Sequence, residues 1–151
     1  MRYGSRMPPL EQHQYERLLR FRTGLRRFLR WSAEQAAEAG LTPAQHQLLL
    51  AVRGHHDPRG PTIGDVAGYL LLRHHSAVEL VDRAQAAGLL ERQVDRDDAR
   101  AVRLRLTRLG ELRLETLTEA HMEELARLES ELHALWEGLD TAVDGAASGS
   151  P

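Results

Sequence analysis

The amino-acid sequence predicts a mainly α-helical fold that carries one small β-hairpin, an α+β class. Over most of the 151 residues, apolar side chains recur at steps of three and four, which is the pattern of one helix face. Helix start and stop residues divide this pattern into separate segments. Between residues 89 and 107 two short segments flank a polar turn, and the second alternates apolar and polar side chains, which indicates a hairpin.

The N-terminal part predicts two helices. The first is expected from Leu10 to Ala37 and ends at Gly40. Thr42-Pro43 then combines an N-cap residue with a proline in the first helical position, and the second helix ends before Gly54. One face of the first helix carries Leu18, Phe21, Leu25, Phe28, Leu29 and Ser32.

The middle of the chain predicts two short helices and the hairpin. After a loop of composition HHDPRGP (55–61), Thr62 to Asp65 resembles a capping box and opens a helix over 63–70. A turn leads to a helix over 74–87, which Gly88 stops. Strands are expected over 89–94 and 101–107, with the polar segment 95–100 as the hairpin tip.

The C-terminal part predicts one long helix. Thr107 is its expected N-cap, and it extends to about residue 139. A heptad-like seam of leucines lies at residues 125, 128, 132 and 135. We expect residues 1–9 to form a flexible arm, residues 10–140 to form a single domain and residues 141–151 to form a disordered tail.

The composition limits the classes of function. The sequence contains no cysteine, which excludes disulfides, thiolate metal sites and thiol redox sensing. No apolar run approaches the roughly 20 residues that span a membrane, and no apolar secretory segment follows the N-terminus. We therefore expect a cytoplasmic protein without membrane association.

The net charge of −2 hides an asymmetry along the chain. All twenty basic residues are arginines. Residues 1–61 carry ten arginines and five acidic residues, residues 62–110 carry eight and seven, and residues 111–151 carry two and ten. The charges are therefore +5, +1 and −8, so that a basic half can present a positive face or pair with an acidic segment in a dimer.

Two short helices followed by a two-stranded hairpin are the element order of a winged helix-turn-helix. Such a unit places its second helix in the major groove of DNA. The hairpin is then a wing that reaches the neighbouring minor groove, where the negative potential favours an arginine. The alternative is a helical dimer that acts through protein partners, for which the glutamate-rich C-terminal helix is suited but the wing is not.

The chain resembles the MarR family of bacterial transcription regulators, the multiple-antibiotic-resistance type. The matching segments are LTPAQHQLL (41–49), TIGDVAGYL (62–70), AVELVDRAQAAGLLER (77–92) and DDARAVRLRLTRLG (97–110). The resemblance implies a homodimer whose dimerisation helices are residues 10–40 and 108–140, with a DNA-binding lobe over 42–107. It also implies a ligand-released repressor of a near-palindromic operator.

The resemblance assigns DNA contacts residue by residue. The start of the recognition helix and the next turns would contribute Arg73, His74, His75, Ser76, Glu79 and Arg83. In the wing, Asp98 and Arg100 match the family pattern, whereas Ala99 replaces its usual basic residue and Arg96 is the candidate to compensate. The residues alone leave two alternatives open. Arg100 would otherwise be a solvated hairpin charge, and Arg83 would otherwise pair with Asp82 or an acidic wing residue.

The resemblance also implies a small aromatic or phenolic anion as effector. The candidate residues for its pocket are Arg22, Phe28, Trp31 and His46, and the alternative is that they are interface residues. Arg22 lies at the edge of the apolar stripe of the first helix, where a guanidinium could hold a carboxylate.

Metal and enzyme functions are not expected. His74 and His75 are adjacent and diverge by about 100° on a helix, so they do not face one ion. His55, His56 and Asp57 form a loop cluster that we expect to be solvent-exposed, and His121 and His133 are twelve residues apart. A zinc-responsive regulator of the same fold is the remaining metal alternative. We find no phosphate-cradling loop, nucleophile elbow or His-Glu metal motif, and we expect no cofactor.

Overall fold

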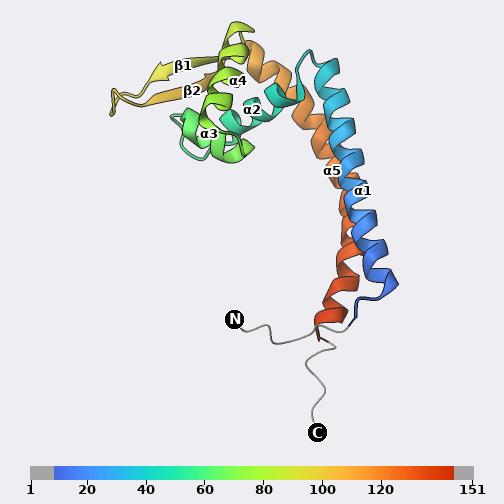
Figure 1. The fold of residues 1–151 in the computed structure, drawn as a ribbon. Coiled ribbons are helices and arrows are strands. Elements are labelled where there is room, and N and C mark those ends of the chain that lie inside the picture. Colours follow the sequence, from blue (N-terminus) through green and yellow to red (C-terminus); the bar gives the residue numbers. More distant parts are fainter. Residues whose placement is uncertain (1–8, 145–151) are drawn as a thin grey trace, which may run out of the picture. The chain divides into compact units, whose positions relative to one another are not determined.

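The computed structural model describes the backbone of residues 9–144 and the side chains of residues 9–133. In chain order its elements are α1 (Gln12–Glu38), α2 (Pro43–Gly54), α3 (Ile63–Leu70), α4 (His74–Ala86), β1 (Leu90–Val94), β2 (Val102–Leu106) and α5 (Arg108–Asp144) (Figure 1). The predicted fold class, five helices with one antiparallel hairpin, is confirmed.

The predicted element boundaries agree with the structure to within about two residues, except at the C-terminus. There α5 continues to Asp144, beyond the predicted end near residue 139. The rest of the expected tail (145–151) and residues 1–8 of the expected arm lie outside the described residues, as do the side chains of the seam beyond residue 133.

The chain divides into two compact units. The first, which we call the hairpin unit, consists of residues 32–121 and contains α2, α3, α4 and the hairpin. The second, which we call the terminal unit, consists of the segment up to residue 31 and the segment from residue 122. The hairpin unit therefore includes the end of α1 and the start of α5, which the sequence analysis assigned to the dimerisation helices.

The core of the hairpin unit is aliphatic. Its fully buried side chains come from every element of the unit and include Leu48, Leu49, Val66, Val81, Leu89, Leu90 and Leu104. Both predicted N-caps are present: Thr42 and Thr62 each form a complete capping box, with Gln45 and Asp65 as the third helical residues. The strands pair antiparallel, with Leu90 opposite Leu106 and Val94 opposite Val102.

Two glycines allow the backbone to approach the hairpin closely. Gly60 has φ +89°, and a Cβ atom there would lie 2.2 Å from the carbonyl oxygen of Leu104. At Gly110, in the first turn of α5, a Cβ atom would lie 2.0 Å from the carbonyl oxygen of Leu89. Thr107 caps α5 as predicted, because its Oγ1 accepts a hydrogen bond from the backbone N–H of Gly110 at 3.2 Å. These contacts fix the base of the hairpin against the helices.

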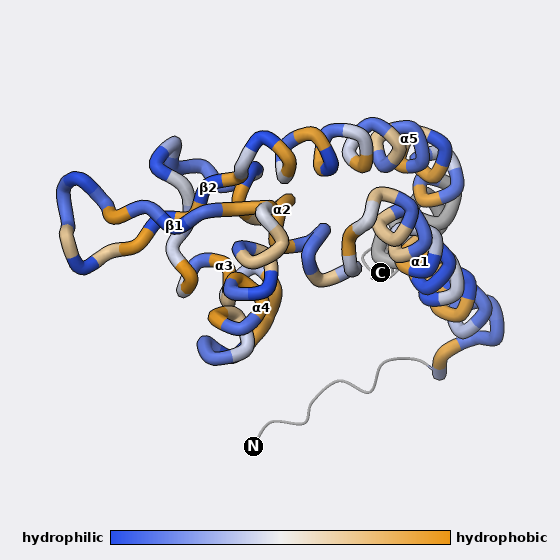
Figure 2. The backbone as a smooth tube through the Cα atoms, turned by 90° about the horizontal axis from the view of Figure 1, so that it is seen from above, coloured by the Kyte–Doolittle hydropathy of each residue, from blue (hydrophilic) through white to orange (hydrophobic). Residues whose placement is uncertain are grey.

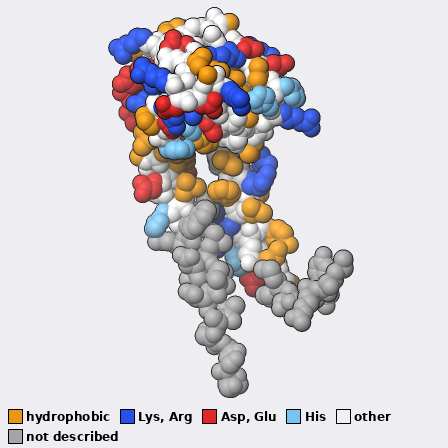
Figure 3. Space-filling model, turned by 90° about the vertical axis from the view of Figure 1, so that its left-hand side faces the viewer, with side chains coloured by type: hydrophobic (Ala, Val, Ile, Leu, Met, Phe, Trp, Pro, Cys, Tyr) orange, Lys and Arg blue, Asp and Glu red, His pale blue; other side chains and the backbone are white. Residues whose placement is uncertain are grey.

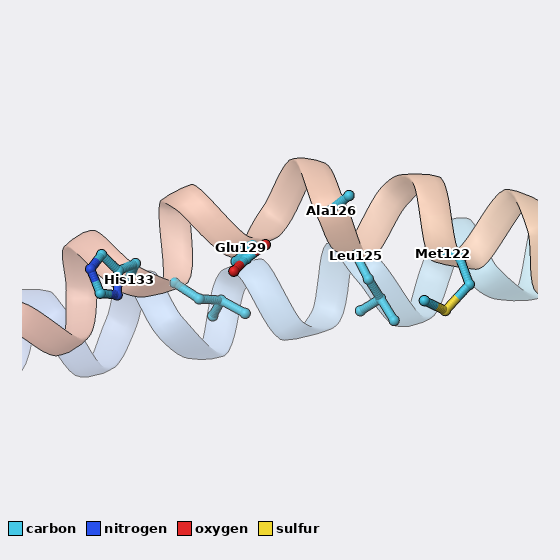
Figure 4. A pocket seen from close by; sticks show the side chains of 6 residues that line it. Met122, Leu125, Ala126, Glu129 and His133 are labelled. Carbon is cyan, nitrogen blue, oxygen red and sulfur yellow. The ribbon is translucent and has the colours of Figure 1, made fainter.

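The terminal unit keeps much of its apolar surface uncovered. Leu18 is 58% exposed, Leu25 is 47% exposed and Leu125 is 45% exposed. Hydrophobic and hydrophilic residues alternate along α1 and α5 (Figure 2). Met122 and Leu125 project from the same side of α5 (Figure 4). A groove of about 770 Å³ between the two helices is lined by Leu19, Phe21, Leu25, Phe28, Leu125 and Leu132, among others.

Candidate nucleic-acid interface

The start of α4 is open to solvent. Arg73 is the N-cap residue and makes no side-chain capping hydrogen bond. Arg73, His74 and His75 are exposed, and Ser76 is half-buried. The opposite face of the helix is anchored in the core by Ala77, Leu80, Val81 and Ala84. The apolar pattern of α4 therefore turns its first residues outward, as the sequence analysis expects of a helix that reads DNA.

Further along α4, Glu79 and Arg83 are also exposed. Arg83 Nη2 lies 3.9 Å from Glu79 Oε2, one helical turn away. The alternative pairing of Arg83 with Asp82 is not observed, because Asp82 Oδ1 accepts a hydrogen bond from Arg92 Nη2 at 2.6 Å. An exposed ion pair of this kind stabilises a protein by little, so the Arg83 guanidinium can exchange Glu79 for a phosphate.

The wing tip exposes its charged residues. Arg96, Asp98 and Arg100 are all exposed. Asp98 shapes the turn, because its Oδ1 accepts a hydrogen bond from the backbone N–H of Arg100 at 3.0 Å and its carbonyl oxygen accepts one from Ala101 at 3.0 Å. These two hydrogen bonds hold the turn beside Arg100, and the wing-support role of Asp98 in DNA binding stays a prediction.

Asp95 anchors the wing, although the sequence patterns did not predict this role. Its side chain is 1% exposed, and its Oδ2 accepts a hydrogen bond from Arg103 Nε at 2.8 Å. Its Oδ1 accepts a hydrogen bond from the backbone N–H of Asp97 at 2.9 Å. The bond from Asp97, and then that from Arg103, hold the pKa of Asp95 below its ordinary value of 3.8. The sequence feature that could have predicted this pair is an acidic residue, Asp95, directly after the first strand, combined with the alternating Arg103 and Arg105 on the second strand.

The loop between α2 and α3 braces the same wing. Arg59 binds Asp57 through a charge-assisted hydrogen bond of 2.7 Å and reaches Asp95 Oδ2 at 3.4 Å. Arg103 Nη1 donates to the carbonyl oxygen of Gly60, and Arg105 Nη2 donates to that of Pro58, both at 3.2 Å. The hydrogen bond from Arg59 lowers the pKa of Asp57. Charged side chains of the wing and of this loop thus hold the wing against the loop between α2 and α3.

Charges of both signs are mixed on the side of the hairpin unit that faces the viewer in Figure 3. Exposed arginines and histidines lie among aspartates and glutamates rather than in one continuous basic patch. The described residues therefore show local positive groups at the start of α4 and at the wing tip. Positively charged side chains at these two places could contact DNA phosphates individually, without a continuous basic surface.

The four candidate effector residues are divided between the two units. In the terminal unit, the rings of Phe28 and Trp31 have centroids 6.0 Å apart, and Arg22 on the same helix is exposed. His46 belongs to the hairpin unit and is 7% exposed. The structure brings Phe28 and Trp31 into contact, and it places His46 beside another histidine, His121, with ring centroids 4.8 Å apart.

Three helices contribute to this histidine pair. His121 Nε2 lies 2.7 Å from Ser32 Oγ, and its Nδ1 lies 2.7 Å from the carbonyl oxygen of Leu117. Because a carbonyl oxygen only accepts, Nδ1 of His121 carries a proton. Burial, and then the proximity of His121, lower the pKa of His46 below 6.5. The environment therefore favours the neutral form of His46.

The histidine loop differs from its prediction. His56 is exposed, but the side chain of His55 is only 4% exposed, so the expectation of a solvent-exposed cluster is wrong for His55. His55 Nδ1 lies 2.8 Å from the hydroxyl of Tyr69, and its Nε2 lies 3.9 Å from Asp65 Oδ2. The ring fills the space between the loop and α3. Among the described residues, no three His, Asp or Glu side chains are placed to hold a metal ion.

The arrangement of α3, α4 and the hairpin defines the chain as a winged helix-turn-helix protein. A family model described as "MarR family" matches residues 39–101, which run from the end of α1 to the wing. The resemblance to the MarR family that the sequence motifs indicated is therefore confirmed. No curated protein sequence matches the chain.

Solved structures share the fold over most of the chain. A MarR family transcription regulator is 22% identical, covers 91% of this chain and 95% of its own, and gives a TM-score of 0.70. A MepR–DNA complex from S. aureus is 21% identical, covers 85% of this chain and 91% of its own, and gives a TM-score of 0.66. A MarR family protein from Bacillus stearothermophilus is 24% identical, covers 93% of this chain and 100% of its own, and gives a TM-score of 0.65. Within the described residues, no helix is both long and apolar enough to span a membrane.

Proposed function

We propose that this protein is a sequence-specific regulator of transcription that binds double-stranded DNA as a homodimer. The observation that carries the proposal is the joint exposure of the start of α4 and the wing tip on one compact unit. The match of residues 39–101 to the MarR family supports it, as does the similarity of the fold to a MepR–DNA complex. It is a binding protein in this proposal and not an enzyme.

In the proposed complex, α4 lies in the major groove and the wing approaches the adjacent minor groove. His74, His75 and Ser76 read base edges, and Arg73 and Arg83 contact phosphates. Glu79 faces the same groove and can accept a hydrogen bond from a cytosine amino group. Arg96 and Arg100 place positive charge at the minor groove, where a narrow groove concentrates negative potential.

The homodimer is inferred from the uncovered apolar side chains of the terminal unit. Leu18, Leu25 and Leu125 are each about half exposed on these helices, and exposed apolar surface of this kind supports an interface with a second copy of the chain. A two-fold dimer would present two copies of α4 to a near-palindromic operator, with half-sites about 34–36 Å apart, one turn of DNA. The terminal unit would then be the dimerisation lobe.

The proposed regulation is repression that a ligand relieves. A small aromatic or phenolic anion would bind near Arg22, Phe28 and Trp31 of the terminal unit; the fourth candidate, His46, is buried in the hairpin unit. It would release the DNA by stabilising a dimer geometry that does not match the operator. Phe28 and Trp31 offer aromatic rings for stacking, and Arg22 offers an exposed guanidinium for an acidic group.

The test is DNA binding by the full chain to the DNA upstream of its own gene, in a salt series, with unrelated DNA as competitor. The Arg100→Ala variant is expected to bind all DNA sequences more weakly. The slope of the logarithm of its binding constant against the logarithm of the salt concentration should be smaller in magnitude by about 1 per wing. His74→Gln and His75→Gln are expected to change base preference instead. Arg127→Ala is the matched control, because Arg127 lies on α5 of the terminal unit and pairs with Glu124.

Two results would contradict the proposal. The first is a wild-type chain that binds the upstream DNA no better than the competitor. The second is unchanged DNA affinity in Arg100→Ala and in both histidine variants. Either result would favour a helical dimer that acts through protein partners.

A further inference from the structure

The turn between α3 and α4 contains an unusual backbone conformation. Leu71 has φ 53° and ψ 41°, in the left-handed region. It is the one non-glycine residue with positive φ within the described part of the chain. Glycine or asparagine ordinarily occupies such a position after a helix, because the Cβ atom of most other residues lies too close to a backbone carbonyl oxygen there. A leucine at this site therefore weakens the turn compared with the residues that the turn prefers.

Packing does not account for this leucine. Its side chain is 92% exposed, more than any other large hydrophobic residue in the described part of the chain. Its neighbours Tyr69 and Leu72 are 52% and 37% exposed, so the turn presents an apolar surface next to Arg73 at the start of α4. The side chain of Leu71 therefore stabilises neither the turn nor the core. Strain of this kind clusters at functional sites.

The position of Leu71 is fixed by the backbone. Its N–H donates to the carbonyl oxygen of Gly68 at 3.4 Å, and the N–H of Leu72 donates to that of Ala67 at 2.9 Å. Arg73, the N-cap of α4, follows two residues later. The backbone therefore fixes Leu71 two residues before the N-cap of α4, so its apolar side chain is presented next to the end of α4 that exposes Arg73, His74 and His75.

We propose that Leu71 is a DNA-specificity residue that contacts the C5-methyl group of a thymine in the major groove. The inference rests on the proposed function, because it places the start of α4 at the DNA. Thymine is the base that offers an apolar group at the groove edge, and apolar side chains read it by direct contact. Leu71 adds a preference for thymine at one position in each half-site, beyond the contacts of the polar residues that follow it.

The experiment first selects binding sequences from a random DNA library with the wild-type chain. Each thymine of the selected site is then replaced in turn by deoxyuridine, which lacks the methyl group, and affinities are measured. Wild type is expected to lose about fourfold in affinity per half-site at one thymine, the value of one buried methyl group. Leu71→Asn is expected to bind the thymine-containing site about fourfold more weakly and to show no response to that deoxyuridine.

The variants separate recognition from folding. Asparagine has nearly the shape of leucine and tolerates the left-handed conformation, so Leu71→Asn should melt at the same temperature as wild type or higher. Leu71→Met keeps an apolar side chain and should restore the response to deoxyuridine. Leu50→Gln is the control, because Leu50 is another half-exposed leucine of the same unit, on α2.

The outcomes distinguish this inference from the proposed function. If no sequence is enriched by the wild-type chain, the proposed function fails and the inference fails with it. If a site is enriched but wild type and Leu71→Asn respond alike to every deoxyuridine, the proposed function stands and the inference is overturned. Unchanged DNA affinity in Leu71→Asn also overturns it.

Discussion

The carboxylate of Asp95 and the guanidinium of Arg103 form a buried ion pair at the end of the strands that adjoins the wing tip. The distance between Arg103 Nε and Asp95 Oδ2 is 2.8 Å, and the side chains are 17% and 1% exposed. Arg59, from the loop before α3, approaches the same carboxylate oxygen. Removing the Asp95 carboxylate would leave Arg103 and Arg59 without their counter-charge. This carboxylate therefore links the wing to the loop before α3.

Asp95→Asn should loosen the wing without unfolding the core. Asparagine retains an acceptor for the N–H of Asp97 but loses the charge that holds Arg103 and Arg59. We expect a lower melting temperature, faster amide hydrogen exchange at residues 96–100, and weaker DNA binding. Asp97→Asn is the control, because Asp97 is 82% exposed and contacts Arg59 at 3.5 Å. Equal exchange rates in both variants would contradict the anchoring role.

The same variant has a defined pH signature. The pKa of Asp95 lies below 3.8 in the folded protein, so the unfolded chain binds more protons in this range. Its contribution to the free energy of unfolding is therefore complete above about pH 5 and is lost as the pH falls through the folded-state pKa. Denaturant unfolding of Asp95→Asn should depend less steeply on pH between about 5 and 3 than that of wild type.

His46 should make stability depend on pH closer to neutrality. Its pKa lies below 6.5 in the folded protein because of burial and of His121, so folding favours the neutral ring. The stabilisation is complete above about pH 7 and decreases as the pH falls below about 6.5, where the unfolded chain takes up a proton first. In His46→Phe the decrease in unfolding free energy between about pH 7 and 5 should be smaller. His56→Gln, at an exposed position, should behave like wild type.

Gly110→Ala tests the close approach of α5 to the hairpin. Alanine normally favours a helix over glycine by about 1 kcal/mol. Here the new methyl group would collide with the carbonyl oxygen of Leu89, 2.0 Å away, so we expect a net loss of about 1–3 kcal/mol in urea unfolding. Gly68→Ala in α3 meets no atom within 4 Å and should instead stabilise by about 0.5–1 kcal/mol. A stabilising Gly110→Ala would show that α5 does not pack this closely.

The terminal unit should associate into a homodimer at micromolar concentration. Leu18→Glu combined with Leu25→Glu places charges on its exposed apolar face and should raise the dissociation constant at least tenfold, because burying each leucine is worth roughly 1.5–3 kcal/mol. Sedimentation velocity measures the change. Leu50→Glu, in the hairpin unit, is the control. A wild-type chain that sediments as a folded monomer would refute the dimer.

Local sequence signals were sufficient to predict the order and type of the elements. Thr42 and Thr62 form capping boxes with residues three positions along the chain, so their hydrogen bonds are encoded within one helical turn. The alternation of Val102, Leu104 and Leu106 likewise marks a strand by its own period. The DNA contacts assigned from the family resemblance stay predictions; these residues are exposed, except for the half-buried Ser76.

Tertiary structure decided the features that depend on residues far apart in the chain. Asp95 meets Arg59 at a sequence separation of 36 residues, and Ser32 meets His121 at a separation of 89. No periodicity links such residues, because their contact depends on how several helices pack together. The left-handed conformation of Leu71 was equally invisible, since leucine is a residue that ordinarily avoids it. The sequence by itself determined the helices, their caps and the hairpin through short-range physics; the packed fold decided which charges anchor the wing and which apolar side chain stands exposed beside α4.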